Sequence, residues 1–224
     1  MSVIRKKLIN AVIDKSFNLI NPNIHNNIHK GHEFQKQTVL ANKSLTNDEK
    51  TEAIRILNRD CDRDKILYNE GTTRICENCN QECLATSYCE LCVRNYLIEN
   101  FKNWTSGNNN IDNLIQECQM KTIEPQAIAE WIPYNNLQNV KYLTKGGCSE
   151  IYTADWIDGS YDDWDSKKQQ LTREFESSSQ AVVLKRLENV ENANQSWLDE
   201  VCNFKVVFKE NNKLNLNNNS FFLG

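Results

Sequence analysis

The sequence has no apolar run long enough to cross a membrane. A transmembrane helix needs about 18 or more consecutive apolar residues, and no stretch of these 224 residues approaches that length. A secretory signal is also missing, because Asp14, Lys15 and Ser16 interrupt the segment after the basic residues 5–7. We therefore expect a cytoplasmic protein without a membrane span.

The chain also has no excess of positive charge. Its 26 basic residues stand against 30 acidic ones, which gives a net charge of −4 and a sequence pI near 5.5. Proteins that bind nucleic acid normally carry a basic face, so a nucleic-acid partner is not expected. The nine cysteines are numerous, and in a reducing compartment we expect several of them to be metal ligands or free thiols rather than disulfides.

Residues 1–45 are polar and are interpreted as a poorly ordered or helical segment. Apolar residues between positions 3 and 13 indicate one amphipathic helix. Thr46 followed by Glu49 resembles a capping box. It predicts a helix of about three or four turns within residues 46–70.

The three histidines all lie in the N-terminal segment. The spacing of His25 and His29 would place both on one helix face, which leaves a metal site as an alternative. Acidic and thiol partners are lacking around them and around His32. We therefore favour solvated loop residues.

Two cysteine pairs carry the first strong chemical signal. Cys76-x-x-Cys79 and Cys89-x-x-Cys92 are separated by nine residues. Each C-x-x-C turn presents two thiolates on one side of the backbone, and zinc takes four such ligands in a tetrahedron. Four cysteine ligands leave no open position for water, so the zinc would be structural. The alternative is reduced cysteine without metal, and Cys83 is a spare thiol that could replace one ligand.

Apolar residues recur at helical spacing directly after Cys92. The second cysteine pair is therefore expected at the start of a helix, as in treble-clef-like zinc modules, within residues 74–105. A helical connector is expected over residues 106–136. It contains one helix around 111–118 and a short one that starts near Pro125.

From residue 137 the pattern changes to strands. Two alternating segments flank Gly146 and Gly147, which predicts a hairpin whose backbone can approach phosphates. A buried-looking strand then ends in Lys185, and Glu200 lies on the amphipathic stretch that follows. Such a lysine and glutamate can form the ion pair that holds a nucleotide's phosphates. The polar residues 158–180 are expected to form a flexible loop.

These residues resemble the N-terminal lobe of a protein kinase. The resemblance rests on KYLTKGGCSEIYTA at residues 141–154 and VVLK at 182–185. With residues 101–108 and 130–134 and the cysteine pairs, the chain is similar to a fungal group of tyrosine-kinase-like protein kinases, over about residues 64–204. The resemblance implies an antiparallel sheet and an αC helix over residues 137–205.

The same resemblance implies an ATP site. Gly146 would be the second glycine of the nucleotide loop, beside Gly147, and Ile151 would pack on adenine. Lys185 would contact the α- and β-phosphates, with Glu200 as its partner on αC. Thr144 and Ser149 stand where the family has glycine, which should weaken phosphate approach.

No His-Arg-Asp, Asp-Phe-Gly or Ala-Pro-Glu motif follows Glu200. We therefore expect a pseudokinase-like fragment that is truncated within the N-lobe and inactive alone. Whether the chain is an enzyme stays open. The alternative is a non-catalytic adaptor whose zinc module binds a protein partner. A third interpretation is an incomplete product, because residues 206–224 leave the family pattern and six of the nine residues 211–219 are asparagine.

Overall fold

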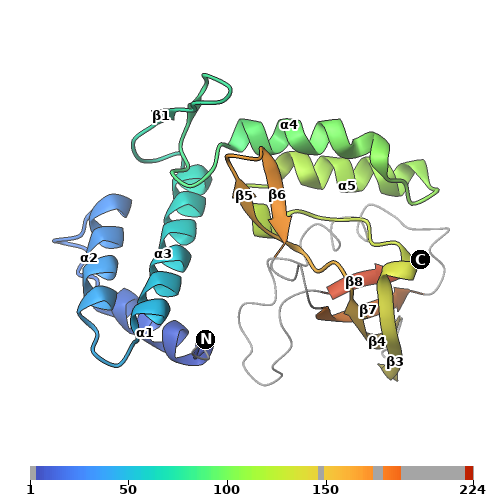
Figure 1. The fold of residues 1–224 in the computed structure, drawn as a ribbon, viewed down its shortest axis with the longest axis horizontal. Coiled ribbons are helices and arrows are strands. Elements are labelled where there is room, and N and C mark those ends of the chain that lie inside the picture. The colour runs from blue at the N-terminus through green and yellow to red at the C-terminus, as the bar shows by residue number, and fades with distance from the viewer. Residues whose placement is uncertain (1–3, 146–148, 174–178, 188–219, 224) are drawn as a thin grey trace. The chain divides into compact units, whose positions relative to one another are not determined.

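A computed structural model describes residues 4–145, 149–173, 179–187 and 220–223 (Figure 1). These residues combine helices with small β-sheets, so the α+β fold class predicted from the sequence is confirmed. No helix among them is both long enough and apolar enough to span a bilayer. The chain divides into two compact units, residues 1–93 and 94–224.

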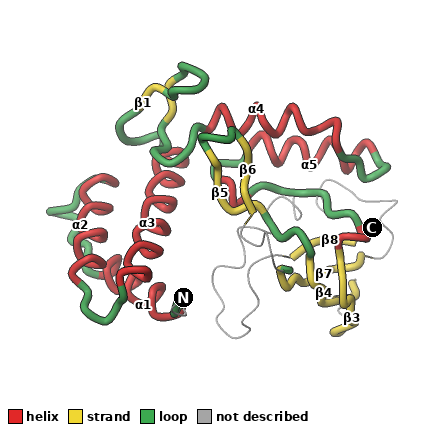
Figure 2. Tube along the Cα trace, in the orientation of Figure 1, coloured by secondary structure: helices red, strands yellow, loops and turns green. Residues whose placement is uncertain are grey.

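Three helices begin the first unit: α1 (Lys6–Asn18), α2 (Ile28–Ala41) and α3 (Asn47–Tyr68) (Figure 2). Their shared core consists of small and branched apolar side chains: Ile9, Val12, Val39, Leu45, Ala53 and Leu57. The expected N-terminal helix corresponds to α1. The sequence did not reveal α2, because its buried positions are only Gly31 and Val39, too few for a visible apolar stripe.

The capping box at the start of α3 is confirmed. The Thr46 side chain accepts from the backbone N–H of Glu49, and the Glu49 carboxylate accepts from the backbone N–H of Thr46. The Arg5 guanidinium, whose Nε lies 2.7 Å from Oε1 of Glu49, holds the pKa of this carboxyl well below its usual range. The helix runs for 22 residues within the predicted range 46–70, which is longer than the three or four turns indicated by the apolar spacing. Ion pairs at i,i+3 support its charged second half. It ends at Asn69, whose φ of 50° is left-handed.

A small hairpin follows α3. Strands β1 (Arg74–Ile75) and β2 (Glu82–Cys83) pair antiparallel, with Arg74 opposite Cys83. Helix α4 (Glu90–Asn100) comes next, and the boundary between the two units falls inside it. The order of hairpin and helix is that expected for a treble-clef-like module.

The second unit contains one further α-helix among its described residues, α5 (Asn109–Lys121), and three single turns of 3₁₀ helix. The turns are η1 (Phe101–Asn103), η2 (Pro125–Ala127) and η3 (Tyr134–Asn136). The predicted short helix after Pro125 is wrong beyond η2, because residues 128–133 are not helical. Pro133 disfavours the helical conformation in the residue before it, and the Gln119 side chain donates to the carbonyl of Ala129.

A four-stranded sheet follows, with the order β3 (Leu137–Lys145), β4 (Ser149–Trp156), β7 (Gln180–Leu187) and β8 (Ser220–Leu223). The pairs β3–β4 and β4–β7 are antiparallel, and β8 runs parallel to β7. One sheet face is buried through Leu137, Ala154, Trp156, Val182 and Leu184.

The expected flexible loop is wrong for residues 161–173. They form a second hairpin of β5 (Tyr161–Asp165) and β6 (Gln170–Arg173). The cross-strand pair Trp164 and Leu171 is buried, and the Trp164 ring contacts Tyr96 edge-on. Arg173 bonds to Glu130, 2.7 Å away, which ties the hairpin to the segment before β3.

Candidate metal centre

The first cysteine pair lies in the turn between β1 and β2. The backbone N–H of Cys76 donates to the carbonyl of Gln81, and that of Asn80 donates to the carbonyl of Cys76, both at 2.9 Å. Asn80 closes this turn with a left-handed φ of 55°, a conformation that asparagine tolerates well. The turn therefore holds Cys76 and Cys79 at one end of the hairpin.

The second pair lies at the start of α4, as predicted. Cys89 precedes the helix and Cys92 lies in its first turn, where the N–H of Val93 donates to the carbonyl of Cys89 at 3.0 Å. A helix N-terminus has free N–H groups and a partial positive charge, which favour thiolate over thiol. Hairpin and helix thus supply two sulfurs each.

The four sulfurs form a compact group, all within 4.8 Å of one another. Sγ of Cys76 lies 3.7 Å from Sγ of Cys92, and Sγ of Cys79 lies 3.6 Å from Sγ of Cys89. A tetrahedral zinc ion with Zn–S bonds of about 2.3 Å places its sulfurs about 3.8 Å apart. Three of the four residues are buried, and Cys79 is half-buried. The prediction that these cysteines lie together is confirmed, and their geometry fits a zinc ion.

The surroundings shift the pKa of Cys76 in the opposite direction from those of Cys89 and Cys92. Burial raises the pKa of Cys76, but hydrogen bonds from the backbone N–H groups of Cys79 and Asn78 outweigh it and lower the pKa to about 6. Burial raises the pKa of Cys89 and Cys92 above the usual thiol value. Several thiolates this close repel one another, so a bound cation is what allows all four to ionise.

Cys83 lies beside the tetrahedron rather than in it. It belongs to a separate group with Cys89 and Glu90. Its Sγ faces the carbonyls of Arg74 at 3.6 Å and Ala85 at 3.9 Å, which are partners for a protonated thiol. The structure therefore does not place Cys83 as a fifth member of the four-sulfur site.

The three histidines lie apart from any metal group found among the described residues. His25 stacks on Phe34 with ring centroids 4.2 Å apart, and His29 is exposed on the first turn of α2. His32 also lies within α2 and bonds to Asn58 of α3 at 3.1 Å. The expectation of a loop is therefore wrong for His29 and His32, and the expectation of solvation is wrong for His32.

Of the predicted nucleotide-site residues, two are described. Ile151 on β4 pairs directly with Lys185 on β7, and Lys185 is half-buried. Residues directly opposite in an antiparallel pair share a sheet face. Gly146, Gly147 and Glu200 lie outside the described residues, and so does the expected αC helix.

Comparisons of the chain with models of protein families, with curated proteins and with solved structures give no match. The geometry of the four-sulfur site therefore carries the functional argument.

Proposed function

We propose that Cys76, Cys79, Cys89 and Cys92 bind one structural zinc ion. The observation that carries this proposal is the set of Sγ–Sγ distances, 3.6 and 3.7 Å for the two measured pairs, which suits a single tetrahedral ion. Four sulfur ligands leave no position for a substrate or an activated water. The ion would cross-link the hairpin to the start of α4.

The function that follows is that of a non-catalytic binding module, with a protein as the partner. Few large apolar side chains are buried near the site, with Tyr88 the largest between residues 74 and 92. A module with so little apolar core would gain much of its stability from a bound metal. The zinc ion would therefore keep the module folded so that its surface can bind.

The test is the metal content of the purified full chain together with replacement of zinc by Co²⁺. We expect one zinc per chain, and thiolate-to-cobalt charge-transfer absorption of a four-sulfur site. Cys79→Ser should remove most of the binding, because it deletes one of four ligands. Cys61→Ser is the matched control, because Cys61 is a buried free thiol on α3 outside the group. Stoichiometric zinc in Cys79→Ser would refute the assignment.

A second candidate function is nucleotide binding by a kinase-like sheet. It is supported by the pairing of Ile151 with Lys185 on one face of an antiparallel β3–β4–β7 arrangement. In this proposal Ile151 packs on the base and Lys185 neutralises phosphate charge, while the catalytic base of kinases has no counterpart in the sequence. No phosphoryl transfer is expected from this chain.

A thermal-shift assay with ATP separates the two candidates. A rise in melting temperature without magnesium, lost in Lys185→Met and kept in Lys141→Met, would support the nucleotide site. Lys141 is an exposed lysine on β3 and serves as the matched control. Zinc binding without any ATP-induced shift would leave the binding module as the function. Phosphate transfer that Lys185→Met abolishes would contradict the inactive state.

A further inference from the structure

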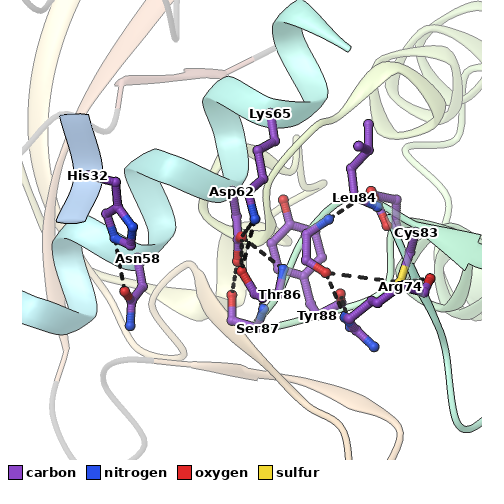
Figure 3. A network of polar contacts seen from close by, with 12 residues as sticks. His32, Asn58, Asp62, Lys65, Arg74, Cys83, Leu84, Thr86, Ser87 and Tyr88 are labelled. Atoms are coloured by element: carbon purple, nitrogen blue, oxygen red, sulfur yellow. Dashed lines mark hydrogen bonds and ion pairs between the residues drawn. The ribbon is translucent and has the colours of Figure 1, made fainter. Parts of the chain in front are cut away.

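The loop that leads into the second cysteine pair is held by three charged side chains, in addition to the buried Ala85 and Tyr88. Residues 84–88 connect β2 to Cys89 and α4. Their backbone groups bond to Asp62 of α3 and Arg74 of β1 (Figure 3). They also bond to Glu90 of α4. Three elements of the first unit thus converge on one short loop.

Asp62 makes the densest set of these contacts. Its Oδ1 accepts from the backbone N–H of Thr86 at 2.8 Å and from the Thr86 hydroxyl at 2.5 Å. Its Oδ2 accepts from the backbone N–H of Ser87 at 2.9 Å and from the Ser87 hydroxyl at 2.6 Å. The side chain has no exposed surface, and Nζ of Lys65 lies 3.8 Å away. A buried carboxylate with four donors and a nearby cation fixes its partners firmly.

The other two charged groups hold the flanking loop positions. The Arg74 guanidinium donates to the carbonyls of Ala85 and Tyr88, at 2.8 and 2.5 Å. Oε1 of Glu90 accepts from the N–H groups of Leu84 and Ala85, at 2.7 and 3.1 Å. Arg74 and Glu90 are close neighbours of the ligand cysteines in sequence. Asp62 belongs to a different element, α3, and links the loop to the helical core together with Lys65, whose Nζ donates to the Thr86 hydroxyl at 3.4 Å.

We propose that Asp62 is a positioning residue of the metal centre, a role that rests on the proposed zinc site. By clamping Thr86 and Ser87, it fixes the backbone immediately before Cys89 and so orients the second ligand pair before metal arrives. Preorganised ligands lose less conformational entropy on binding, which raises metal affinity. Because linkage is reciprocal, zinc also stabilises α3 through the same contacts.

The expected effect is a loss of zinc affinity in a protein that keeps its helices. Outer-shell substitutions at zinc sites typically cost about 10- to 100-fold in metal affinity. Asp62→Asn replaces one carboxylate oxygen by an NH₂ group, which cannot accept the hydrogen bonds that Thr86 or Ser87 donates. We therefore expect the zinc affinity to fall by about 10-fold or more. Asp60→Asn is the matched control, because Asp60 lies on the same helix with a side chain 42% exposed.

The experiment is zinc titration of the full chain against a competing chelator, with far-UV circular dichroism to record helix content. A weaker affinity in Asp62→Asn, with unchanged helix content and a wild-type affinity in Asp60→Asn, supports the role. A changed Co²⁺ absorption spectrum in Asp62→Asn would show altered ligand orientation, which a merely stabilising residue would not cause. Wild-type affinity in folded Asp62→Asn overturns the proposal.

Thr86→Val provides the second variant if Asp62→Asn fails to fold. It removes the Thr86 hydroxyl, which donates to Asp62 and accepts from Nζ of Lys65, and it keeps the bond from the backbone N–H of Thr86 to Asp62. Loss of the bond from the Thr86 hydroxyl to the Asp62 carboxylate should lower the zinc affinity about threefold or more. An unchanged affinity overturns the proposal. If the wild-type chain itself binds no zinc, the zinc site is wrong. If it binds zinc and every Asp62 and Thr86 variant binds equally, only the positioning role is wrong.

Discussion

Replacing Arg173 with Met should weaken the attachment of the β5–β6 hairpin to the segment before β3, where the bonds Gln126–Asp162 and Tyr161–Glu130 remain. One guanidinium nitrogen bonds to Oε2 of Glu130 at 2.7 Å, and another bonds to the carbonyl of Gly159. The guanidinium carbon lies 3.9 Å from the ring centroid of Tyr161, a close cation–π contact. Glu130 is only 9% exposed, so the substitution leaves a nearly buried carboxylate without this cation.

The magnitude follows from these contacts. Each hydrogen bond to a charged group contributes about 1.5 kcal/mol at the lower end, which suits Arg173 because 26% of its side chain is exposed. The ring contact adds about 0.5 to 1 kcal/mol. Two such bonds and the ring contact together give an expected fall in the free energy of unfolding of about 3.5 to 4 kcal/mol. Met keeps part of the aliphatic packing, so no further loss is added.

Urea unfolding followed by tryptophan fluorescence measures this loss, because Trp156 and Trp164 are buried in the same unit. Together with Glu130→Gln and the double variant, Arg173→Met forms a double-mutant cycle. We expect it to give a coupling energy between Arg173 and Glu130 of about 1.5 kcal/mol or more. Lys168→Met is the control, since this lysine is 69% exposed and its nitrogen lies 3.9 Å from Asp165. It should cost less than about 0.5 kcal/mol. A loss below about 1 kcal/mol in Arg173→Met would refute the reasoning.

Three further outcomes are expected. Burial, then the charge of Lys36, lowers the pKa of His32, so the unfolded chain binds the proton more readily. The free energy of unfolding should therefore fall as the pH drops below about 6.5. In urea unfolding at a series of pH values, His32→Gln should make the midpoint less dependent on pH in this range. An equally steep dependence in the variant would contradict the role of His32. Leu184→Ala should lower the free energy of unfolding by about 2 to 5 kcal/mol, because Leu184 is 1% exposed. A loss under about 1 kcal/mol, measured by calorimetry, would mean that Leu184 is not a core residue. Chelating zinc should speed hydrogen exchange at the Cys76 and Asn80 amides, whose bonds close the first cysteine turn, and unchanged exchange would mean that metal does not hold this turn.

The metal centre could be predicted from local sequence because its geometry is local. Each C-x-x-C pair fixes two sulfurs through one turn, and the periodic residues after Cys92 revealed the helix. The capping box of Thr46 and Glu49 was visible for the same reason, since both partners lie within one turn.

The elements that escaped prediction depend on contacts between distant residues. Asp62 bonds to residues 86 and 87, and nothing in the pattern around position 62 marks it as more than one charge in a charged helix. The β5–β6 hairpin looked polar because ten of its thirteen residues, 161–173, are polar or charged. Only the pairing of Trp164 with Leu171 shows that one face is buried.

The two units differ in how soon they can be completed during synthesis. All contacts of the metal centre lie between residues 62 and 93, so the ribosome has delivered every part of it once residue 93 has emerged. The sheet of the second unit pairs residues 220–223 with residues 183–186, a long-range parallel contact. Because domains fold as units in the order of synthesis and long-range pairing is slow, the metal centre would acquire its ion on the nascent chain. The sheet would become complete only after residue 223 is added.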